Sequence, residues 1–227
     1  MQPRLTQTDR AEILRYLGCR STQGQDELLA WVAEGQAAVA AAAAPRACWR
    51  VFPLDGMAPV GSGLMLAGED IRRHLDGCDR AVLLAVTLGR AVDELLLRAE
   101  VRDMARALVW DSCASAAVEN VCDNFETDLR AHFRAQGVCL TGRFSPGYGD
   151  LPLSLQPAFC AALDAERRIG LTVSRSGLLL PRKSVTAVLG LAATPKTGYR
   201  AGCAHCLLYD TCQRRKEGNP CGAEPAT

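Results

Sequence analysis

The ten residues from Arg143 to Pro152, Arg-Phe-Ser-Pro-Gly-Tyr-Gly-Asp-Leu-Pro, form the most constrained segment of the sequence. Pro146 fixes one backbone φ angle, and the two glycines that flank Tyr148 permit positive φ angles. We therefore predict a strand end followed by a rigid loop. Arg143 offers a planar donor fork to a carboxylate, and Tyr148 offers a flat face with a hydroxyl. The pair suits a small zwitterionic ligand, and an ordinary surface loop is the alternative.

Composition excludes several classes of partner. Of the 227 residues, 48% are hydrophobic and 22% are charged, and the formal net charge is +1. This near balance gives no electrostatic reason to expect nucleic acid or an anionic membrane as a partner. No apolar run approaches the roughly 18 residues of a membrane span. The first residues are too polar for a secretory signal, so we expect a cytoplasmic protein.

The order of the predicted elements favours an α+β fold with a mostly antiparallel sheet. The apolar run 80–87 fits a buried strand, and Thr8 and Ser154 are predicted helix caps. No G-x-G-x-x-G or Walker-type loop occurs, which argues against nucleotide binding by those devices. We predict helices at 9–17, 26–44, 69–75, from 92, at 103–134 and at 155–168, and strands at 48–54, 80–87, 138–143, 171–176 and 184–192.

The long helix 103–134 carries the second candidate site residue. Its predicted apolar face includes Ala105, Leu108 and Val109, and Glu119 lies among small residues. A carboxylate on a close-packed helix face can meet a ligand ammonium or sulfonium group. A solvated surface glutamate is the alternative.

Eleven cysteines divide into two populations. Seven are scattered through apolar surroundings, and we expect them to be reduced core residues. The other four crowd into the C-terminal tail as Cys203-x2-Cys206-x5-Cys212-x8-Cys221. Four thiols at this density predict a metal site. Four cysteine ligands can bind either zinc or an iron–sulfur cluster, and the spacing of these cysteines does not distinguish the two. A thiol-rich tail without metal is the alternative.

Three patches in residues 143–190 occur together in a known family. After the Arg143–Pro152 loop come Ile169-Gly-Leu-Thr-Val-Ser-Arg-Ser176 and Pro181-Arg-Lys-Ser-Val-Thr186. In order and spacing this segment resembles the reactivation domain of cobalamin-dependent methionine synthase. The chain departs from that pattern at Gly149, where the family has proline, and at 173–175, where Leu-Thr-Glu is usual. The turn 86–89 and the alanine-rich helix before Glu119 are similar to single-domain relatives encoded apart from the synthase.

The resemblance implies a fold and a domain division. The fold would be a curved, twisted, mostly antiparallel sheet flanked by helices, with a ligand groove along the sheet. We expect a reactivation-like domain at 1–198, whose N-terminal helical part covers about 1–45. A cysteine-rich tail at 199–227 would follow it.

The resemblance also implies S-adenosylmethionine as the ligand. Arg143 would hold the methionyl carboxylate, and Glu119 would face the amino group. The backbone of Ser145 and Gly147 would line the ligand, and Tyr148 would pack near the sulfonium. Tyr199 is a further candidate after the last strand. No residue of the chain is predicted to be catalytic, because the implied contribution is to position the methyl group.

The implied role is reactivation of a corrinoid methyltransferase. Rescue of cob(II)alamin needs one electron and a methyl group from S-adenosylmethionine, so the expected partners are an electron donor and a corrinoid protein. That protein would be a methionine synthase core lacking its own reactivation domain, or a related system, and it would carry the cobalamin. An iron–sulfur cluster in the tail could supply the electron. Two alternatives are an adaptor that does not use S-adenosylmethionine and an ordinary methyltransferase acting on a small molecule.

Overall fold

A five-stranded antiparallel sheet forms the centre of the protein. The computed structural model describes residues 1–19, 26–196 and 216. The strand order is β2-β1-β3-β7-β4, and every neighbouring pair is antiparallel. The strands are β1 (Arg46–Asp55), β2 (Ala58–Pro59), β3 (Arg80–Thr87), β4 (Cys139–Leu140) and β7 (Ser184–Ala192), and a separate two-stranded sheet pairs β5 (Thr172–Val173) with β6 (Leu179–Leu180).

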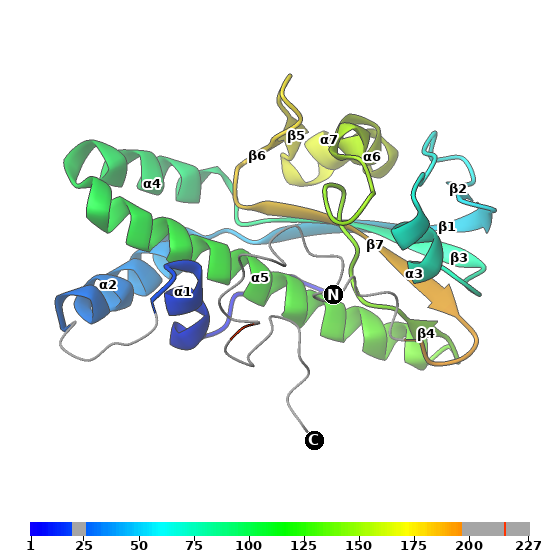
Figure 1. Cartoon of the computed structure of the whole chain (residues 1–227), viewed down its shortest axis with the longest axis horizontal. Helices are drawn as coiled ribbons and strands as arrows, with labels where there is room; N and C mark the ends of the chain where they lie inside the picture. The colour runs from blue at the N-terminus through cyan, green and yellow to red at the C-terminus, as the bar shows by residue number, and fades with distance from the viewer. Residues whose placement is uncertain (20–25, 197–215, 217–227) are drawn as a thin grey trace.

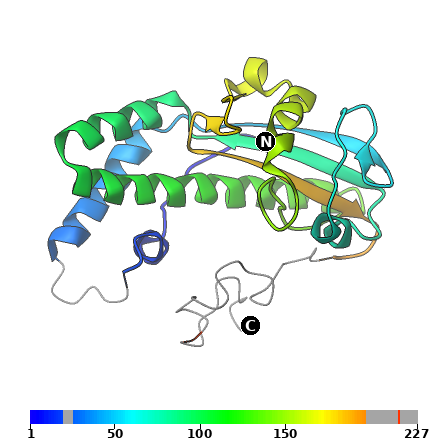
Figure 2. The same cartoon turned by 45° about the horizontal axis from the view of Figure 1, so that its top comes forward.

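Helices cover both faces of the sheet. The elements α1, α2, α4 and α5 pack on one face, and α3, α6 and α7 pack on the other. Figure 2 shows α6 and α7 above the sheet and α2 and α5 below it. The helices are α1 (Arg10–Tyr16), α2 (Asp26–Ala42), α3 (Glu69–His74), α4 (Arg90–Arg102), α5 (Met104–Arg134), α6 (Gln156–Leu163) and α7 (Ala165–Ile169), with a 3₁₀ turn at Leu153–Leu155.

The central strand β3 explains why the sheet needs both layers. Seven consecutive residues, Ala81 to Thr87, are completely buried. Side chains on a strand alternate between faces, so Leu84 packs in the cluster around α5 while Leu83 packs in the cluster around α6. Leu84 pairs with Ala187 of β7 and with Trp49 of β1. The continuous apolar run predicted this buried strand with the correct ends.

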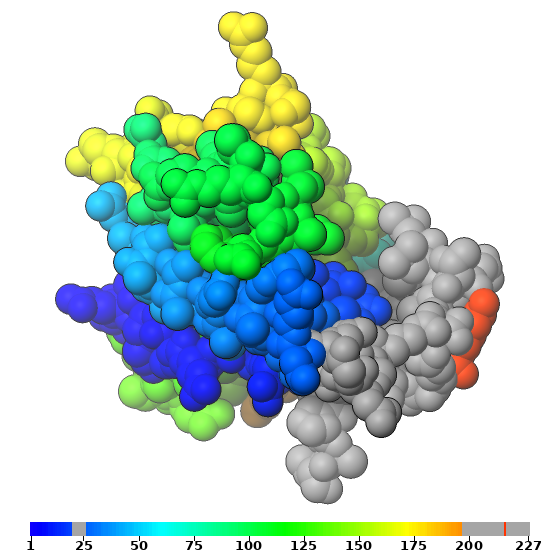
Figure 3. Space-filling model, turned by 90° about the vertical axis from the view of Figure 1, so that its left-hand side faces the viewer, coloured from blue at the N-terminus to red at the C-terminus, as the bar shows by residue number. Residues whose placement is uncertain are grey.

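The helix α5 spans 31 residues and runs along one whole face of the sheet (Figure 1). Asp103 begins it by accepting hydrogen bonds from the backbone N–H groups of Ala105 and Arg106, both at 3.1 Å. Together with α4 it forms a hairpin (Figure 1), and the green residues of this hairpin occupy part of the end of the molecule that faces the viewer in Figure 3. Of the predicted apolar face, Val109, Ala116 and Val121 are buried, whereas Ala105 is exposed and Leu108 is 64% exposed.

Local geometry corrects five further predictions. Asp9, not Thr8, caps α1 by accepting from the Ala11 N–H at 2.8 Å. The helix predicted at 155–168 is two helices, because Asp164 adopts a left-handed conformation with φ 52°, and Ser154 does not cap it. The strand predicted at 171–176 is limited to residues 172–173, which pair with β6 in the separate two-stranded sheet. The strand predicted at 138–143 is limited to β4 and a bridge at Phe144.

The seven scattered cysteines are free thiols, as expected. Four of them are buried, and burial raises the pKa of Cys48 and of Cys160 to about 11. Within the described residues, no group of three or more His, Cys, Asp or Glu side chains is arranged to hold a metal ion. The four tail cysteines lie outside the described residues. No helix in the described part of the chain is long and apolar enough to span a membrane.

Candidate functional site

The Arg143 side chain is placed by a single β-bridge. Phe144 and Val188 of β7 exchange backbone hydrogen bonds of 2.9 and 2.8 Å. Because neighbouring side chains point to opposite faces of extended backbone, Phe144 enters the core on the α6 side and Arg143 reaches α5 on the other side. The Phe144 ring is buried and contacts the buried His74 ring, with centroids 5.1 Å apart.

The loop after Arg143 is a compact turn. The N–H of Tyr148 donates to Ser145 O at 3.0 Å, and the N–H of Gly147 donates to Leu151 O at 2.8 Å. Gly147 has φ 91° and Gly149 has φ 53°, as the sequence predicts for these two glycines. The Tyr148 ring packs edge-on against Phe144, with centroids 5.3 Å apart, and remains 49% exposed.

Asp150 ties this loop to α3. Its carboxylate accepts from the backbone N–H of Glu69 at 2.5 Å and from that of Asp70 at 3.1 Å. These N–H groups have no partner within the helix, so the loop supplies the helix cap that Gly68 lacks. Gly68 must be glycine here, because a Cβ atom would lie 2.3 Å from the Asp150 carboxylate.

Arg143 meets three carboxylates on one face of α5. One guanidinium nitrogen, Nη2, lies 3.1 Å from Glu119 Oε2 and 2.8 Å from Asp123 Oδ1. The other, Nη1, lies 3.2 Å from Glu126 Oε2 without hydrogen-bond geometry, and it is a buried donor with no acceptor among the described residues. The Arg143 side chain is only 17% exposed. One cation therefore faces three acidic groups.

Glu126 also holds a second arginine. Arg130 donates to Glu126 Oε1 at 2.5 Å and to the carbonyl oxygen of Thr141 at 2.7 Å. These bonds fix the backbone just before Arg143 against the end of α5. Asp123 and Glu126 were not predicted. Their spacing of four and seven residues from Glu119 places all three on one helix face, which was the available signal.

The electrostatics of the cluster follow from burial and charge. Burial raises the pKa of the Glu119 carboxyl, although the Arg143 guanidinium opposes this shift. Burial lowers the pKa of Arg143, but Cys122 and the three carboxylates outweigh that effect, so its pKa lies above the ordinary value. Arg143 is therefore permanently charged.

The helix α1 lies next to Glu119, which the sequence did not predict. Burial raises the pKa of Tyr16, and the nearby Glu119 charge raises it further. The Arg15 guanidinium stacks 4.5 Å from the Tyr16 ring centroid and forms an ion pair with Glu12. A second arginine and a tyrosine, Arg15 and Tyr16, thus lie near Glu119 together with Arg143.

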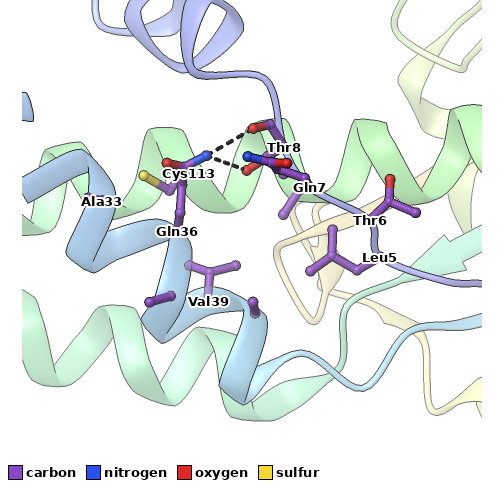
Figure 4. A pocket seen from close by; sticks show the side chains of 11 residues that line it. Leu5, Thr6, Gln7, Thr8, Ala33, Gln36, Val39 and Cys113 are labelled. Atoms are coloured by element: carbon purple, nitrogen blue, oxygen red, sulfur yellow. Dashed lines mark hydrogen bonds between the residues drawn. The ribbon is translucent and has the colours of Figure 1, made fainter.

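A cavity of about 300 Å³ opens between the N-terminal segment, α2 and α5 (Figure 4). The Gln36 side chain crosses it and donates to both the carbonyl and the hydroxyl oxygen of Thr8, each at 2.9 Å. The segment is held along α5 by Thr6, whose N–H donates to Asn120 Oδ1 at 2.9 Å, and by an Arg4–Asp128 ion pair. Two of the lining residues, Cys113 and Ala117, come shortly before Glu119 on α5. Neither Glu119 nor Arg143 lines the cavity.

The structure brings together two of the predicted ligand-binding residues in direct contact, Arg143 and Glu119. Ser145, Gly147 and Tyr148 follow in the same compact loop. Tyr199, Cys203, Cys206, Cys212 and Cys221 lie outside the described residues. A guanidinium with one unused N–H beside an acidic helix face can bind a carboxylate and an adjacent cationic group.

Comparison with known proteins defines the fold. No family model matches the sequence, and no curated protein matches it. Among solved structures, the crystal structure of the MetH reactivation domain bound to AdoHcy is similar, with a TM-score of 0.56 and 15% sequence identity. The match covers 91% of this chain and 77% of that one. The chain therefore has the reactivation-domain fold, an antiparallel sheet flanked by helices.

Proposed function

We propose that this protein binds S-adenosylmethionine and docks on a corrinoid protein to support reductive methylation of cob(II)alamin. The partner is a methionine synthase core without its own reactivation domain, or a related methyltransferase. The proposal is supported by the fold, which is similar to that of a domain bound to AdoHcy, the demethylated form of this ligand. The single observation that carries it is the contact between Arg143 and Glu119.

The chemistry of the cluster fits a methionyl group. The Arg143 Nη1 donor is buried without an acceptor, and a ligand carboxylate would fill that role. Glu119 would accept from the ammonium group, and the half-exposed Tyr148 ring would face the sulfonium. The protein's own residues would then orient the methyl donor, and the corrinoid partner would supply the methyl acceptor.

One observation favours the adaptor alternative, in which S-adenosylmethionine is not used. Arg143 already has three carboxylates around it, so the site satisfies its own charge. A ligand carboxylate must compete with these partners. Firm binding to a corrinoid protein without binding of S-adenosylmethionine would establish this second function.

Calorimetric titration of S-adenosylmethionine into anaerobically purified protein distinguishes the proposed function from the adaptor alternative. We expect Arg143→Lys to weaken binding by about 1.5–3 kcal/mol, roughly tenfold to a hundredfold, because lysine keeps the charge but loses the donor fork. Asp123→Asn is the matched variant. It removes an exposed competitor of the ligand carboxylate, so we expect equal or tighter binding. Wild-type protein that does not bind would contradict the proposal.

The cysteine-rich tail adds a separate proposal. We propose that Cys203, Cys206, Cys212 and Cys221 hold one metal centre, either zinc or an iron–sulfur cluster. An iron–sulfur cluster could relay the electron that reactivation consumes, whereas zinc would organise the tail as a docking surface. Metal analysis of anaerobically purified protein decides between them. Colourless protein that contains zinc and no iron would exclude the electron-relay role.

A further inference from the structure

A second cavity lies between α4 and α5, in the hairpin that these two helices form (Figure 1). Its volume is about 360 Å³, within the range of small-molecule sites. Leu95, Arg98 and Arg102 contribute from α4, and Arg106 and Trp110 contribute from α5. The residues come from positions three or four apart on each helix, so each set forms one helix face.

Two buried N–H donors on this wall have no acceptor among the described residues. They are Trp110 Nε1 and Arg106 Nε. Arg106 uses another nitrogen, Nη1, to bind Glu34 at 3.1 Å, while its Nε lies 3.8 Å from Asp103 Oδ2, too far for a hydrogen bond. Buried donors are rarely left unpaired, because each lost hydrogen bond is unfavourable. Both residues line the cavity, so an acceptor that enters beside them would satisfy these donors.

The charge of the wall indicates that this acceptor is an anion. Three arginines and one aspartate line the cavity. Asp103 already accepts two backbone hydrogen bonds as the cap of α5. Arg98 and Arg102 form no ion pair with any described residue, whereas the nearby Arg90 pairs with Glu94 at 2.8 Å. The remaining wall is apolar, formed by Leu95, Ala99 and the indole ring.

We infer that the α4–α5 cavity binds a small organic anion, an apolar or aromatic body that carries a carboxylate, sulfonate or phosphate. The anionic oxygens accept hydrogen bonds from Trp110 Nε1 and Arg106 Nε, and Arg98 and Arg102 add charge at the mouth. The apolar body lies against Leu95 and the indole ring. This site is separate from the Arg143 cluster and does not depend on its ligand.

Two fluorescent probes test the inference on the full-length chain. Anilinonaphthalene sulfonate has an aromatic body and one sulfonate, and N-phenyl-1-naphthylamine is its uncharged counterpart. We expect saturable binding of the sulfonate that is at least tenfold tighter than binding of the amine. Arg102→Gln should weaken sulfonate binding by about twofold to fivefold, because it removes one exposed positive charge from the mouth of the cavity, and it should leave amine binding unchanged.

Three further variants complete the design. Trp110→Phe keeps an aromatic ring at this position and removes the N–H, so it should also weaken sulfonate binding. Arg90→Gln alters an arginine of α4 outside the cavity, and Val101→Ser removes an 89% exposed apolar side chain, so neither should change binding. Equal affinity for the two probes, or unchanged sulfonate binding by Arg102→Gln, would overturn the inference. Arg102 is exposed, so this variant remains informative even if Trp110→Phe does not fold.

Discussion

Arg143 Nη1 lies 3.2 Å from Glu126 Oε2, and the two side chains are almost equally buried, at 17% and 16% exposed. This contact joins the strand end before the loop to the middle of α5. Glu126 binds Arg130 at the same time, so one carboxylate neutralises two guanidinium groups. The contact therefore organises the site whether or not a ligand is present.

We expect Glu126→Gln to lower the free energy of unfolding by about 1.5–3 kcal/mol, because it leaves two arginines with a neutral partner. Asp123→Asn should lower it by only about 0–1 kcal/mol, because Asp123 is 70% exposed and its ion pair is solvent-screened. Urea unfolding of both variants measures the difference. If both variants lost the same free energy of unfolding, the buried contact of Glu126 would be no more stabilising than the exposed contact of Asp123.

We expect Gly149→Ala to destabilise the protein more than Gly137→Ala. Both glycines have positive φ angles, 53° and 73°, which disfavour alanine by about 1–2 kcal/mol. At Gly149 the added Cβ would also lie 2.7 Å from Asp70 Oδ2 and 3.3 Å from Phe144 Cζ, whereas at Gly137 it meets open space. Thermal unfolding of the two variants, compared side by side, measures the extra effect of the contact.

Asp150→Ala should lower stability by about 0.5–2 kcal/mol, because it removes the cap of α3. It should also increase amide hydrogen exchange at Glu69 and Asp70. Asp150→Asn keeps an accepting oxygen and should restore most of the protection. If the alanine and asparagine variants exchange alike, the cap does not hold the loop to α3.

The Glu119 carboxyl predicts a specific pH dependence. Its pKa is raised by burial in the folded protein, so between the ordinary value near 4.5 and the raised value the folded state binds more protons than the unfolded state. The free energy of unfolding therefore falls as pH rises through this window. Glu119→Gln cannot titrate at this position. As pH rises through the same window, its free energy of unfolding should therefore increase relative to that of the wild type.

Urea unfolding in steps between pH 4 and 7 measures this difference. Glu94→Gln, on the exposed face of α4, controls for the general loss of one negative charge. Curves for wild type and Glu119→Gln that stay parallel over the whole range would contradict the assignment.

The sequence predicted most accurately the helices and strands that are determined by local hydrophobic patterns. The strand 80–87 has no polar interruption between its ends, and the helix 103–134 is bounded by a capping aspartate and a glycine. The break at Asp164 was missed, because the apolar spacing continues across it and aspartate only occasionally adopts a left-handed conformation. The α+β class was recoverable because helices come first along the chain and strands and helices are interleaved after them.

The candidate site was recoverable only in part. The loop itself predicted the positions of Arg143 and Tyr148, and the small residues around Glu119 marked its helix face. Asp123 and Glu126 were missed, because their contact with Arg143 depends on the bridge between Phe144 and Val188 of β7, and strand pairing cannot be derived from local periodicity. Whether Tyr199 and the tail cysteines join this site stays a prediction.

In the proposed site, the ion pairs of Arg143 with Glu119 and Asp123 would compete with the ligand carboxylate. A carboxylate that reaches Arg143 exchanges with one already in place, so its net affinity reflects the difference between two similar interactions. Such exchange favours moderate binding and fast release over tight capture. Added salt, which screens the exposed Asp123 more than the buried Glu126, would loosen the internal competitor first and shift this balance.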